Sequence, residues 1–285
     1  MIVFLMLQDP MTNKNRTPSA RRAAIQRQLL VDGMVAVEAL ARDLGVSVAT
    51  IRRDLTILEE DGSVRRTHGG ATVTAPHGAD QAFALREQID RDAKRFIAYA
   101  AFELIEPDQT LFMNDGSTVL ALARELVASD ISLTVATPGV NIATALSENP
   151  RINAYLAGGL VRHRTLGTAG DFVEQMLSTI NADTAFIAAE GFSANEGLTF
   201  SYEADAKIAR IMNIKAAKTV VLATARKLGQ RDRMTAIPAS RVDVLITDCR
   251  DESRVGEFRE LGVSVIVASK EQNGTSNVEI LSVQS

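Results

Sequence analysis

The 285-residue chain has no tryptophan, only 5% aromatic residues and a single cysteine. The scarcity of aromatic side chains requires a core built from Ala, Val, Ile and Leu. Cys249 has no second cysteine with which to form an internal disulfide, which is typical of a reducing compartment. With one cysteine and three histidines, the sequence contains no Cys/His cluster for zinc, and we expect neither a metal nor another cofactor.

Charge is nearly balanced over the chain but unevenly distributed along it. The formal net charge is −4, yet residues 1–75 contain 10 Lys and Arg against 8 Asp and Glu. A mildly basic N-terminal part on an acidic remainder hints at polyanion binding by that part. Apolar residues make up 46% and charged residues 23%, values that exclude a disordered or collagen-like chain.

The apolar run at the start, residues 1–7, is far shorter than the roughly 20 residues of a membrane span. No basic residue precedes it, no small-residue cleavage site follows it, and Asp9-Pro10 ends it, so a signal peptide is not expected. We therefore expect a cytoplasmic protein without membrane association, for which Met6 and Met11 are alternative starts.

The first 75 residues have the pattern of short helices followed by a β-hairpin. Three helices are expected, the last two joined by a tight turn, at 19–31, 37–44 and 48–61. Ile51, Leu55 and Leu58 recur at helical spacing and predict the buried face of the third helix. Short β-prone runs on both sides of Gly69-Gly70 predict the hairpin, over residues 64–73.

A helix, a tight turn and a second helix form the geometry that places a helix in the DNA major groove. The face of the third helix opposite the apolar one carries Ser, Thr and Arg, which can contact phosphates or base edges. With two arginines of the hairpin, the candidate DNA-binding residues are Ser47, Thr50, Arg52, Arg53, Arg65 and Arg66. The same pattern is also consistent with a small helical dimerisation domain that carries a solvated arginine pair.

Beyond a linker composition at residues 75–89, apolar strands alternate with amphipathic helices. The expected strands are 110–114, 132–136, 152–156, 184–189, 219–223, 242–247 and 263–268. The expected helices are 90–105, 117–128, 140–147, 171–180, 202–217 and 252–261. This alternation predicts an open, mostly parallel α/β sheet. The expected domains are a DNA-binding domain at 17–74, the linker at 75–89, an α/β domain at 90–270 and a loose tail at 271–285.

Loops at the carboxyl ends of the expected strands supply a candidate anion site, where ligands of open α/β sheets bind. Residues 115–118 (Asp-Gly-Ser-Thr) lead from a strand into a helix whose N-terminus attracts anions, although the same tetrapeptide often serves only as a helix cap. Polar and glycine residues of other loops and two lysines complete the candidate effector-binding set: Lys94, Asp115, Gly116, Ser117, Thr118, Asn141, Gly158, Gly159, Arg162 and Lys227.

Residues 46–55 (VSVATIRRDL), followed by Leu58-Glu59 and Gly62, closely resemble the DeoR family of bacterial transcriptional regulators, and residues 65–71 (RRTHGGA) resemble that family's wing. The resemblance spans residues 17–270. It implies a winged helix-turn-helix domain and a C-terminal sensor similar in fold to ribose-5-phosphate isomerases and CoA transferases. It also implies a repressor of carbohydrate transport or catabolism genes, which binds double-stranded operator DNA until a phosphorylated sugar releases it.

Three local departures from the family pattern leave the identity of the effector open: Val119, Pro138-Gly139 and Ala225-Arg226. An isomerase or CoA-transferase-like enzyme with an accessory DNA-binding module is the alternative function. Glu190, after an expected strand, is the one carboxylate suggestively placed for catalysis, but a cap or salt bridge is the favoured role. Asp54 is expected to orient a neighbouring arginine or to cap locally. Because operators are usually read through symmetric half-sites, we expect a homodimer or homotetramer with the interface in the sensor domain.

Overall fold

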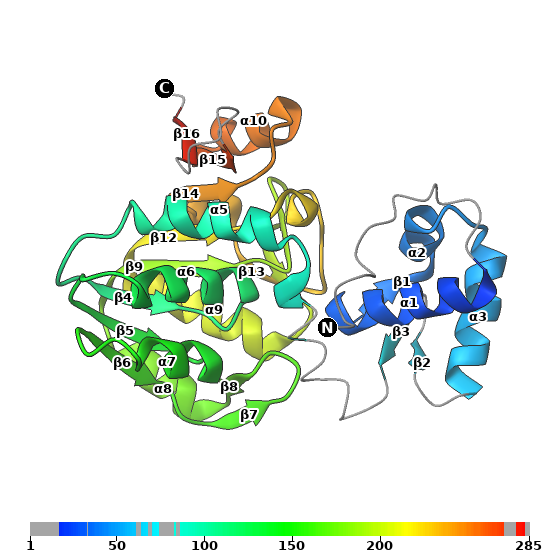
Figure 1. Ribbon diagram of the computed structural model, residues 1–285, viewed down its shortest axis with the longest axis horizontal. Coiled ribbons are helices and arrows are strands. Elements are labelled where there is room, and N and C mark those ends of the chain that lie inside the picture. Colours follow the sequence, from blue (N-terminus) through cyan, green and yellow to red (C-terminus); the bar gives the residue numbers. More distant parts are fainter. Residues whose placement is uncertain are drawn as a thin grey trace, which may run out of the picture. The chain divides into compact units, whose positions relative to one another are not determined.

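The computed structural model describes residues 17–32, 34–60, 64–67, 70–73, 83, 86–270 and 278–282. The chain divides into two compact units with the boundary between Leu85 and Arg86 (Figure 1). Most of the expected linker and of the expected tail lies outside the described residues. No helix among the described residues is long and apolar enough to cross a membrane.

In its described residues, the first unit combines three helices with a small antiparallel sheet. The helices are α1 (Pro18–Asp32), α2 (Val37–Asp43) and α3 (Val48–Glu60). The strands, in the order β1-β3-β2, are β1 (Met34–Ala36), β2 (Val64–Thr67) and β3 (Gly70–Val73). The hairpin β2–β3 was expected, whereas β1 adds a third strand that the sequence pattern did not indicate. Ile25, Leu40, Ile51 and Leu55 are fully buried and join the helices in one core.

The second unit is built on an eight-stranded sheet with the order β16-β15-β14-β12-β9-β4-β5-β6 (Figure 1). Its strands are β4 (Thr110–Met113), β5 (Leu133–Thr137), β6 (Ile152–Leu156), β9 (Ala182–Ala188), β12 (Ala216–Leu222), β14 (Val244–Thr247), β15 (Ser264–Lys270) and β16 (Val278–Ser282). All neighbours pair in parallel except β16, which is antiparallel to β15. The prediction of a loose tail is therefore wrong for residues 278–282, whose apolar residues Val278, Ile280 and Leu281 form an edge strand.

Six helices cover the two faces of this sheet: α5 (Arg91–Phe102), α6 (Ser117–Val127), α7 (Val140–Leu146), α8 (Asp171–Thr179), α9 (Glu203–Lys215) and α10 (Glu252–Glu260). Helices α5, α6 and α7 lie on one face (Figure 1). Apolar residues of α8, α9 and α10 share one core cluster on the other face. The expected strands and helices of residues 90–268 are all present, with bounds that differ by three residues at most. The open, mostly parallel α/β architecture is confirmed.

Several short elements lie outside the main sheet. Strands β7 (Leu160–Arg162) and β8 (Gly167–Ala169) form a hairpin that follows β6. A second antiparallel sheet has the order β10-β11-β13, with β10 (Gly191–Ser193), β11 (Gly197–Phe200) and β13 (Met234–Ile237). Gly197 has φ +72°, and a Cβ there would lie 2.1 Å from the Ile237 carbonyl oxygen, so this turn requires glycine.

Candidate functional site

The exposed face of α3 carries the residues predicted to bind DNA. Because Ile51, Leu55 and Leu58 are buried, Arg52 and Arg53 extend into solvent on the other side of the helix. The Ser47 hydroxyl accepts a hydrogen bond from the Thr50 backbone N–H at 3.2 Å and so caps the start of the helix. The hairpin arginines lie on β2, where Arg65 pairs with Thr72 and Arg66 with Ala71 of β3.

Asp54, on the same helix, points away from the exposed arginines and is only 3% exposed. Its carboxylate accepts hydrogen bonds from Arg21 Nε at 2.6 Å and from Arg21 Nη2 at 3.3 Å. The predicted role of Asp54, orienting an arginine, fits this geometry, although the partner belongs to α1 and not to α3. The pair attaches α3 to α1 and so fixes the direction in which the exposed face of α3 points.

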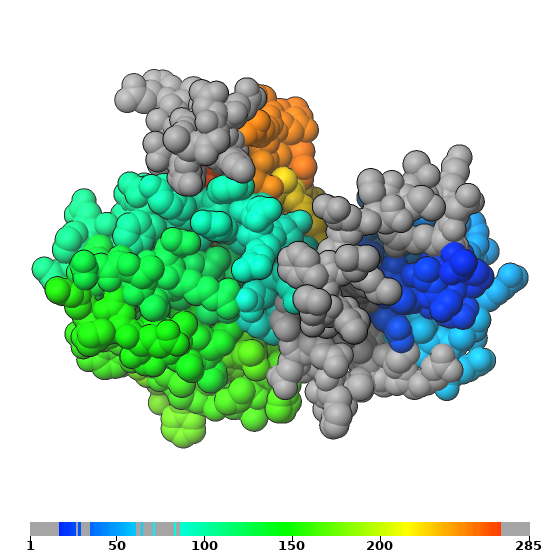
Figure 2. All heavy atoms as spheres, viewed as in Figure 1, coloured from blue at the N-terminus to red at the C-terminus, as the bar shows by residue number. Residues whose placement is uncertain are grey.

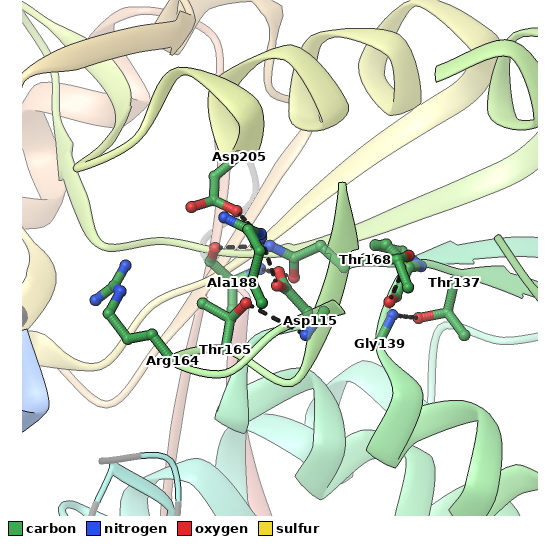
Figure 3. A network of polar contacts seen from close by, with 12 residues as sticks. Asp115, Thr137, Gly139, Arg164, Thr165, Thr168, Ala188 and Asp205 are labelled. Carbon is green, nitrogen blue, oxygen red and sulfur yellow. Dashed lines mark hydrogen bonds and ion pairs between the residues drawn. The ribbon is translucent and has the colours of Figure 1, made fainter. Parts of the chain in front are cut away.

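In the second unit, polar side chains gather where β4, β5 and β9 end (Figure 3). Asn114, directly after β4, holds this region to β9: its amide donates to the Ala188 carbonyl at 3.2 Å and accepts from the Ala188 N–H at 2.9 Å. Next in the chain, Asp115 lies against the start of β8, where a Cβ on Gly167 would fall 2.0 Å from its Oδ2. The side chain of Asp115 therefore faces the β7–β8 hairpin.

Arg162 links two carboxylates at this edge. Its Nη2 donates to Asp115 Oδ2 at 3.0 Å and forms an ion pair with Asp205, in the first turn of α9. Both carboxylates contact the same Arg162 nitrogen, and Asp115 and Asp205 point toward one another (Figure 3). Burial and repulsion by Asp115 raise the pKa of Asp205 to about 6, in spite of the ion pair. Burial alone would lower the pKa of Arg162, but the two carboxylates raise it.

Arg164, two residues further, forms a second ion pair. Its Nη2 lies 2.5 Å from Glu190 Oε1, and Glu190 Oε2 accepts the Ser201 N–H at 2.6 Å. Burial would raise the pKa of Glu190, but Arg164 and the Ser201 amide lower it to about 2. The expectation that Glu190 forms a salt bridge agrees with these contacts. The Arg164 guanidinium also lies 4.8 Å from the centre of the Tyr202 ring.

Arg86, the first residue of the second unit, also contacts this group of charged residues. Its Nη2 donates to the carbonyl of Arg164. Burial, followed by repulsion from Arg164, lowers the pKa of Arg86 to about 10. The site therefore contains three arginines and three carboxylates: Arg86, Arg162, Arg164, Asp115, Glu190 and Asp205. We call these six residues the charged cluster.

Several buried polar atoms in and beside the charged cluster have no hydrogen-bond partner among the described residues. They are three donors, Asn141 Nδ2, Arg162 Nε and Arg164 Nη1, and one acceptor, Asp205 Oδ2. A buried donor or acceptor without a partner costs about 1–3 kcal/mol, so such atoms are few in folded proteins. Donors and an acceptor left unpaired at the carboxyl ends of parallel strands indicate a site for a small polar ligand.

The predicted phosphate loop leads into α6 as expected, and packing against β9 explains why residue 116 is glycine. Leu120 N–H makes the first intrahelical bond, to the Gly116 carbonyl at 2.9 Å, so the amides ahead of it have no intrahelical acceptor. A Cβ on Gly116 would lie 2.3 Å from the Ala188 Cβ. The close approach of β9 therefore requires glycine at position 116, and the predicted contact of this loop with an anion stays a prediction.

The two predicted lysines lie near one another. Lys94, on α5, is 8% exposed, and its ammonium donates to the carbonyls of Arg86 and of Ile89, the latter at 2.7 Å. Burial lowers the pKa of Lys94 to about 8, and repulsion by Lys227 contributes. An ammonium has three hydrogens, so at most one remains for an anion. The proposed contact of Lys94 with a phosphate stays a prediction, with this restriction.

The two glycines after β6 differ in their surroundings. A Cβ on Gly159 would lie 2.6 Å from the Ala169 carbonyl oxygen, which indicates that packing against β8 requires this glycine, whereas Gly158 is open to solvent. Of the predicted ligand residues, the structure joins Asp115 and Arg162 by a direct bond.

The sequence did not point to Arg86, Arg164 or Asp205 as site residues. Arg164 lies in the turn between β7 and β8, where no regular side-chain period applies. Among the described residues, no group of three or more His, Cys, Asp or Glu could hold a metal ion.

Comparison with known proteins identifies the family. The model of the DeoR-like helix-turn-helix domain matches residues 21–77, and the model of the DeoR C-terminal sensor domain matches residues 89–249. The regulator GolR of Listeria innocua is 32% identical over 252 residues, which are 88% of this chain and 99% of that protein. The repressor GlcR of Bacillus subtilis is 32% identical over 228 residues, 80% of this chain and 87% of its own.

Solved structures are more distantly similar. A ribose-5-phosphate isomerase in complex with phospho-erythronic acid has 19% identity and a TM-score of 0.37, over 48% of this chain and 53% of that enzyme. The eIF2B-β2-δ2 complex of C. thermophilum has 15% identity and a TM-score of 0.45, over 87% and 90% of the two chains. The family models and the named relatives describe regulators, so the alternative of an enzyme is not supported. The chain belongs to the DeoR family and is a DNA-binding transcriptional regulator.

Proposed function

We propose that this regulator is a repressor of carbohydrate transport or catabolism genes, which a phosphorylated sugar releases from its operator. The observation that carries the effector part is the charged cluster, with unpaired buried donors and an unpaired acceptor at one edge of the sheet. Such a set of atoms fits a ligand that has both acceptors and hydroxyl donors, as a sugar phosphate does.

For the operator, α3 enters the major groove with its exposed face toward the bases. Arg52 and Arg53 then read base edges, while Ser47 and Thr50 near the start of the helix contact phosphate or a base edge. Arg65 and Arg66 of the β2–β3 hairpin contact the DNA backbone beside the groove. The proposal rests on the exposure of the α3 arginines and on the family's helix-turn-helix match.

For the effector, the phosphate binds the free amides at the start of α6, around Gly116, Ser117 and Thr118. Lys94 and Lys227 add positive charge, the former through its remaining hydrogen. The sugar then meets Asp115, Asn141 and Arg162, as predicted from the sequence, together with Arg164 and Asp205. Gly158 and Gly159 precede the hairpin that carries both arginines.

Coupling to DNA runs through the segment that begins at Arg86. Arg86 belongs to the charged cluster and is also the first residue of the second unit, which follows the DNA-binding unit in the chain. Lys94 holds the carbonyls of Arg86 and Ile89, so this segment is fastened to the site. A ligand that moves Arg164 changes the contact of Arg86, and can lower operator affinity by the ~1–3 kcal/mol that is common for allosteric coupling.

Two further parts of the proposal concern assembly and location. Because symmetric operators need two reading heads, the repressor acts as a homodimer or homotetramer. Because it binds chromosomal DNA, it acts in the cytoplasm.

The DNA part is tested with operators selected from a random DNA library with the full chain. We expect Arg52→Ala and Arg53→Ala to weaken binding to the selected operator by ~1–3 kcal/mol for each base contact that is lost. Arg65→Ala and Arg66→Ala should weaken binding to all DNA sequences and make the affinity depend less steeply on salt concentration. Arg95→Ala, an exposed arginine of the second unit, is the control. Unchanged operator affinity in all four variants would refute the DNA contacts.

The effector part is tested by calorimetry with ribose 5-phosphate, glucose 6-phosphate, fructose 1-phosphate and fructose 6-phosphate. We expect one of them to bind the chain and to weaken the operator complex. Ser117→Ala and Asn141→Ala should keep operator affinity and lose this response, and Ser178→Ala, on the exposed side of α8, should retain it. If none of these sugar phosphates binds, the proposed effector class is wrong.

A further inference from the structure

Five large apolar side chains are exposed within one stretch of the second unit. Tyr155 and Leu156 end β6, Leu160 and Val161 lie on β7, and Phe172 begins α8; their exposed fractions run from 41% for Leu156 to 77% for Phe172. We call these five side chains the 155–172 patch. The space-filling view shows the chain near residue 150, coloured green, at the molecular surface (Figure 2).

The elements that carry the patch are packed against one another. Leu160 of β7 pairs with Ala169 of β8, and the Thr168 hydroxyl donates to the Ala157 carbonyl. The backbone at Gly159 lies so close to α8 that a Cβ would come within 2.9 Å of Val173 Cγ2. The end of β6, the β7–β8 hairpin and the start of α8 therefore pack against one another, and the five exposed side chains lie on these adjoining elements.

An open strand edge adjoins this surface, because β6 is the last strand of the eight-stranded sheet (Figure 1). The Arg151 carbonyl accepts from Leu133, and Ala157 N–H donates to Thr137, so the odd-numbered residues of this stretch bond to β5. The backbone groups of Ala154 and Leu156 accordingly face away from the sheet. Edge strands with free backbone groups pair readily with another strand.

Neither the patch nor the edge strand carries charge. Residues 152–161 (INAYLAGGLV) contain no Asp, Glu, Lys or Arg, the residues that most often protect an edge strand from pairing. Identical surfaces that meet across a two-fold axis bring like groups together, so an uncharged surface is suited to a second copy of itself. A strongly acidic or basic partner would find no complementary charge in these ten residues.

The patch supplies part of the area that an interface needs, and the edge of β6 would supply more. The five side chains expose together on the order of 500 Å² of mostly apolar surface, beyond the few hundred Å² of scattered surface residues and a large part of the ~800 Å² that each partner buries in a standard interface. Tyr202, Ile214, Met234 and Leu261 are also exposed, at the two ends of α9, on β13 and after α10.

We propose that the 155–172 patch and the open edge of β6 form the interface with a second copy of this chain, as an isologous contact about a two-fold axis. The proposal rests on the proposed function, because a symmetric operator needs two reading heads. It also places the partner on the hairpin that carries Arg162 and Arg164, so a ligand of the charged cluster and the partner chain act on the same hairpin.

The test is sedimentation velocity of the full chain at 1–20 µM. We expect the unaltered chain to be dimeric or larger, and Leu160→Glu and Phe172→Glu to weaken self-association at least 100-fold, because each places two carboxylates in an apolar contact. Ile214→Glu is the matched control, since Ile214 is as exposed as Phe172, at 77%, but lies on α9. Circular dichroism and thermal unfolding check that the variants fold.

Three results would overturn the proposal. An unaltered chain that is monomeric at 20 µM would do so, as would an oligomer that persists in both patch variants or one that Ile214→Glu disrupts equally. Operator binding separates this proposal from the proposed function. We expect the folded monomeric variants to bind a single half-site as tightly as the unaltered chain, and to lose at least tenfold in affinity for the two-half-site operator. Failure of the unaltered chain to bind DNA would instead refute the proposed function.

Discussion

Replacement of Glu190 by glutamine tests the electrostatics of the charged cluster. Glu190→Gln keeps an oxygen for the Ser201 N–H but removes the negative charge beside Arg164. The pKa of Glu190 falls from 4.5 to about 2 in the folded chain. Since each pKa unit corresponds to about 1.4 kcal/mol, the ionised carboxylate stabilises the fold by at most ~3 kcal/mol at pH 7. We expect Glu190→Gln to lose most of this stabilisation.

The effect has a defined pH dependence. A carboxylate whose pKa is lowered on folding contributes its full stability above its unfolded pKa, near 4.5, and loses it as the pH falls toward 2. The difference between the unaltered chain and Glu190→Gln should therefore be constant from pH 8 to about pH 5.5 and fall to roughly half by pH 3. All three tyrosines of the chain, Tyr99, Tyr155 and Tyr202, lie in the second unit, so tyrosine fluorescence during urea unfolding follows that unit alone.

Glu196→Gln provides the matched control. Glu196 pairs with Arg231 at 3.0 Å, but the two side chains are 36% and 70% exposed, so this ion pair is worth less than ~1 kcal/mol. A loss below ~0.5 kcal/mol in Glu190→Gln at pH 7, or a loss that does not shrink toward pH 3, would contradict the assignment of a strong buried pair to Arg164 and Glu190.

Two further predictions concern packing and the orientation of α3. Asp54→Asn removes the charged partner of Arg21, and thermal unfolding of the first unit should show a loss of ~1–3 kcal/mol, while Asp43→Asn at an exposed position should cost less than ~0.5 kcal/mol. Gly116→Ala should cost ~1–3 kcal/mol in urea unfolding by overpacking against Ala188, and Gly116→Ala with Ala188→Gly should recover most of it; no recovery would show that glycine is needed there for another reason.

The regular elements could be predicted because each has a repeating pattern in the sequence. Ile51, Leu55 and Leu58 recur at helical spacing, and all three are buried on one side of α3. The central strands are short apolar runs because helices cover both faces of the sheet. Strands β1, β7, β8 and β10 escaped prediction since three residues are too few to show a period. Three of them pair within local hairpins, β7 with β8 and β10 with β11, which their short lengths did not reveal.

The candidate site was only partly predictable, for a related reason. Asp115 and Arg162 stand out at strand ends, and the structure joins them. Glycine, serine and threonine in loops also suggested ligand contacts, but Gly116 and Gly159 are small because Ala188 and the Ala169 carbonyl lie against them. Asp205 resembled an ordinary acidic residue in the first turn of a helix. Only the fold shows that its carboxylate faces Arg162.

The composition of the charged cluster argues for a role in binding. Buried ion pairs add little to stability compared with apolar residues of the same volume, since desolvation offsets much of their attraction. Stability alone therefore gives no reason to place three arginines and three carboxylates at one edge of the sheet. A polar ligand does give one, because it supplies partners for Asn141 Nδ2, Arg162 Nε and Arg164 Nη1. In the proposed function, Arg86 connects this site to the rest of the chain, since the residue that completes the cluster also begins the second unit.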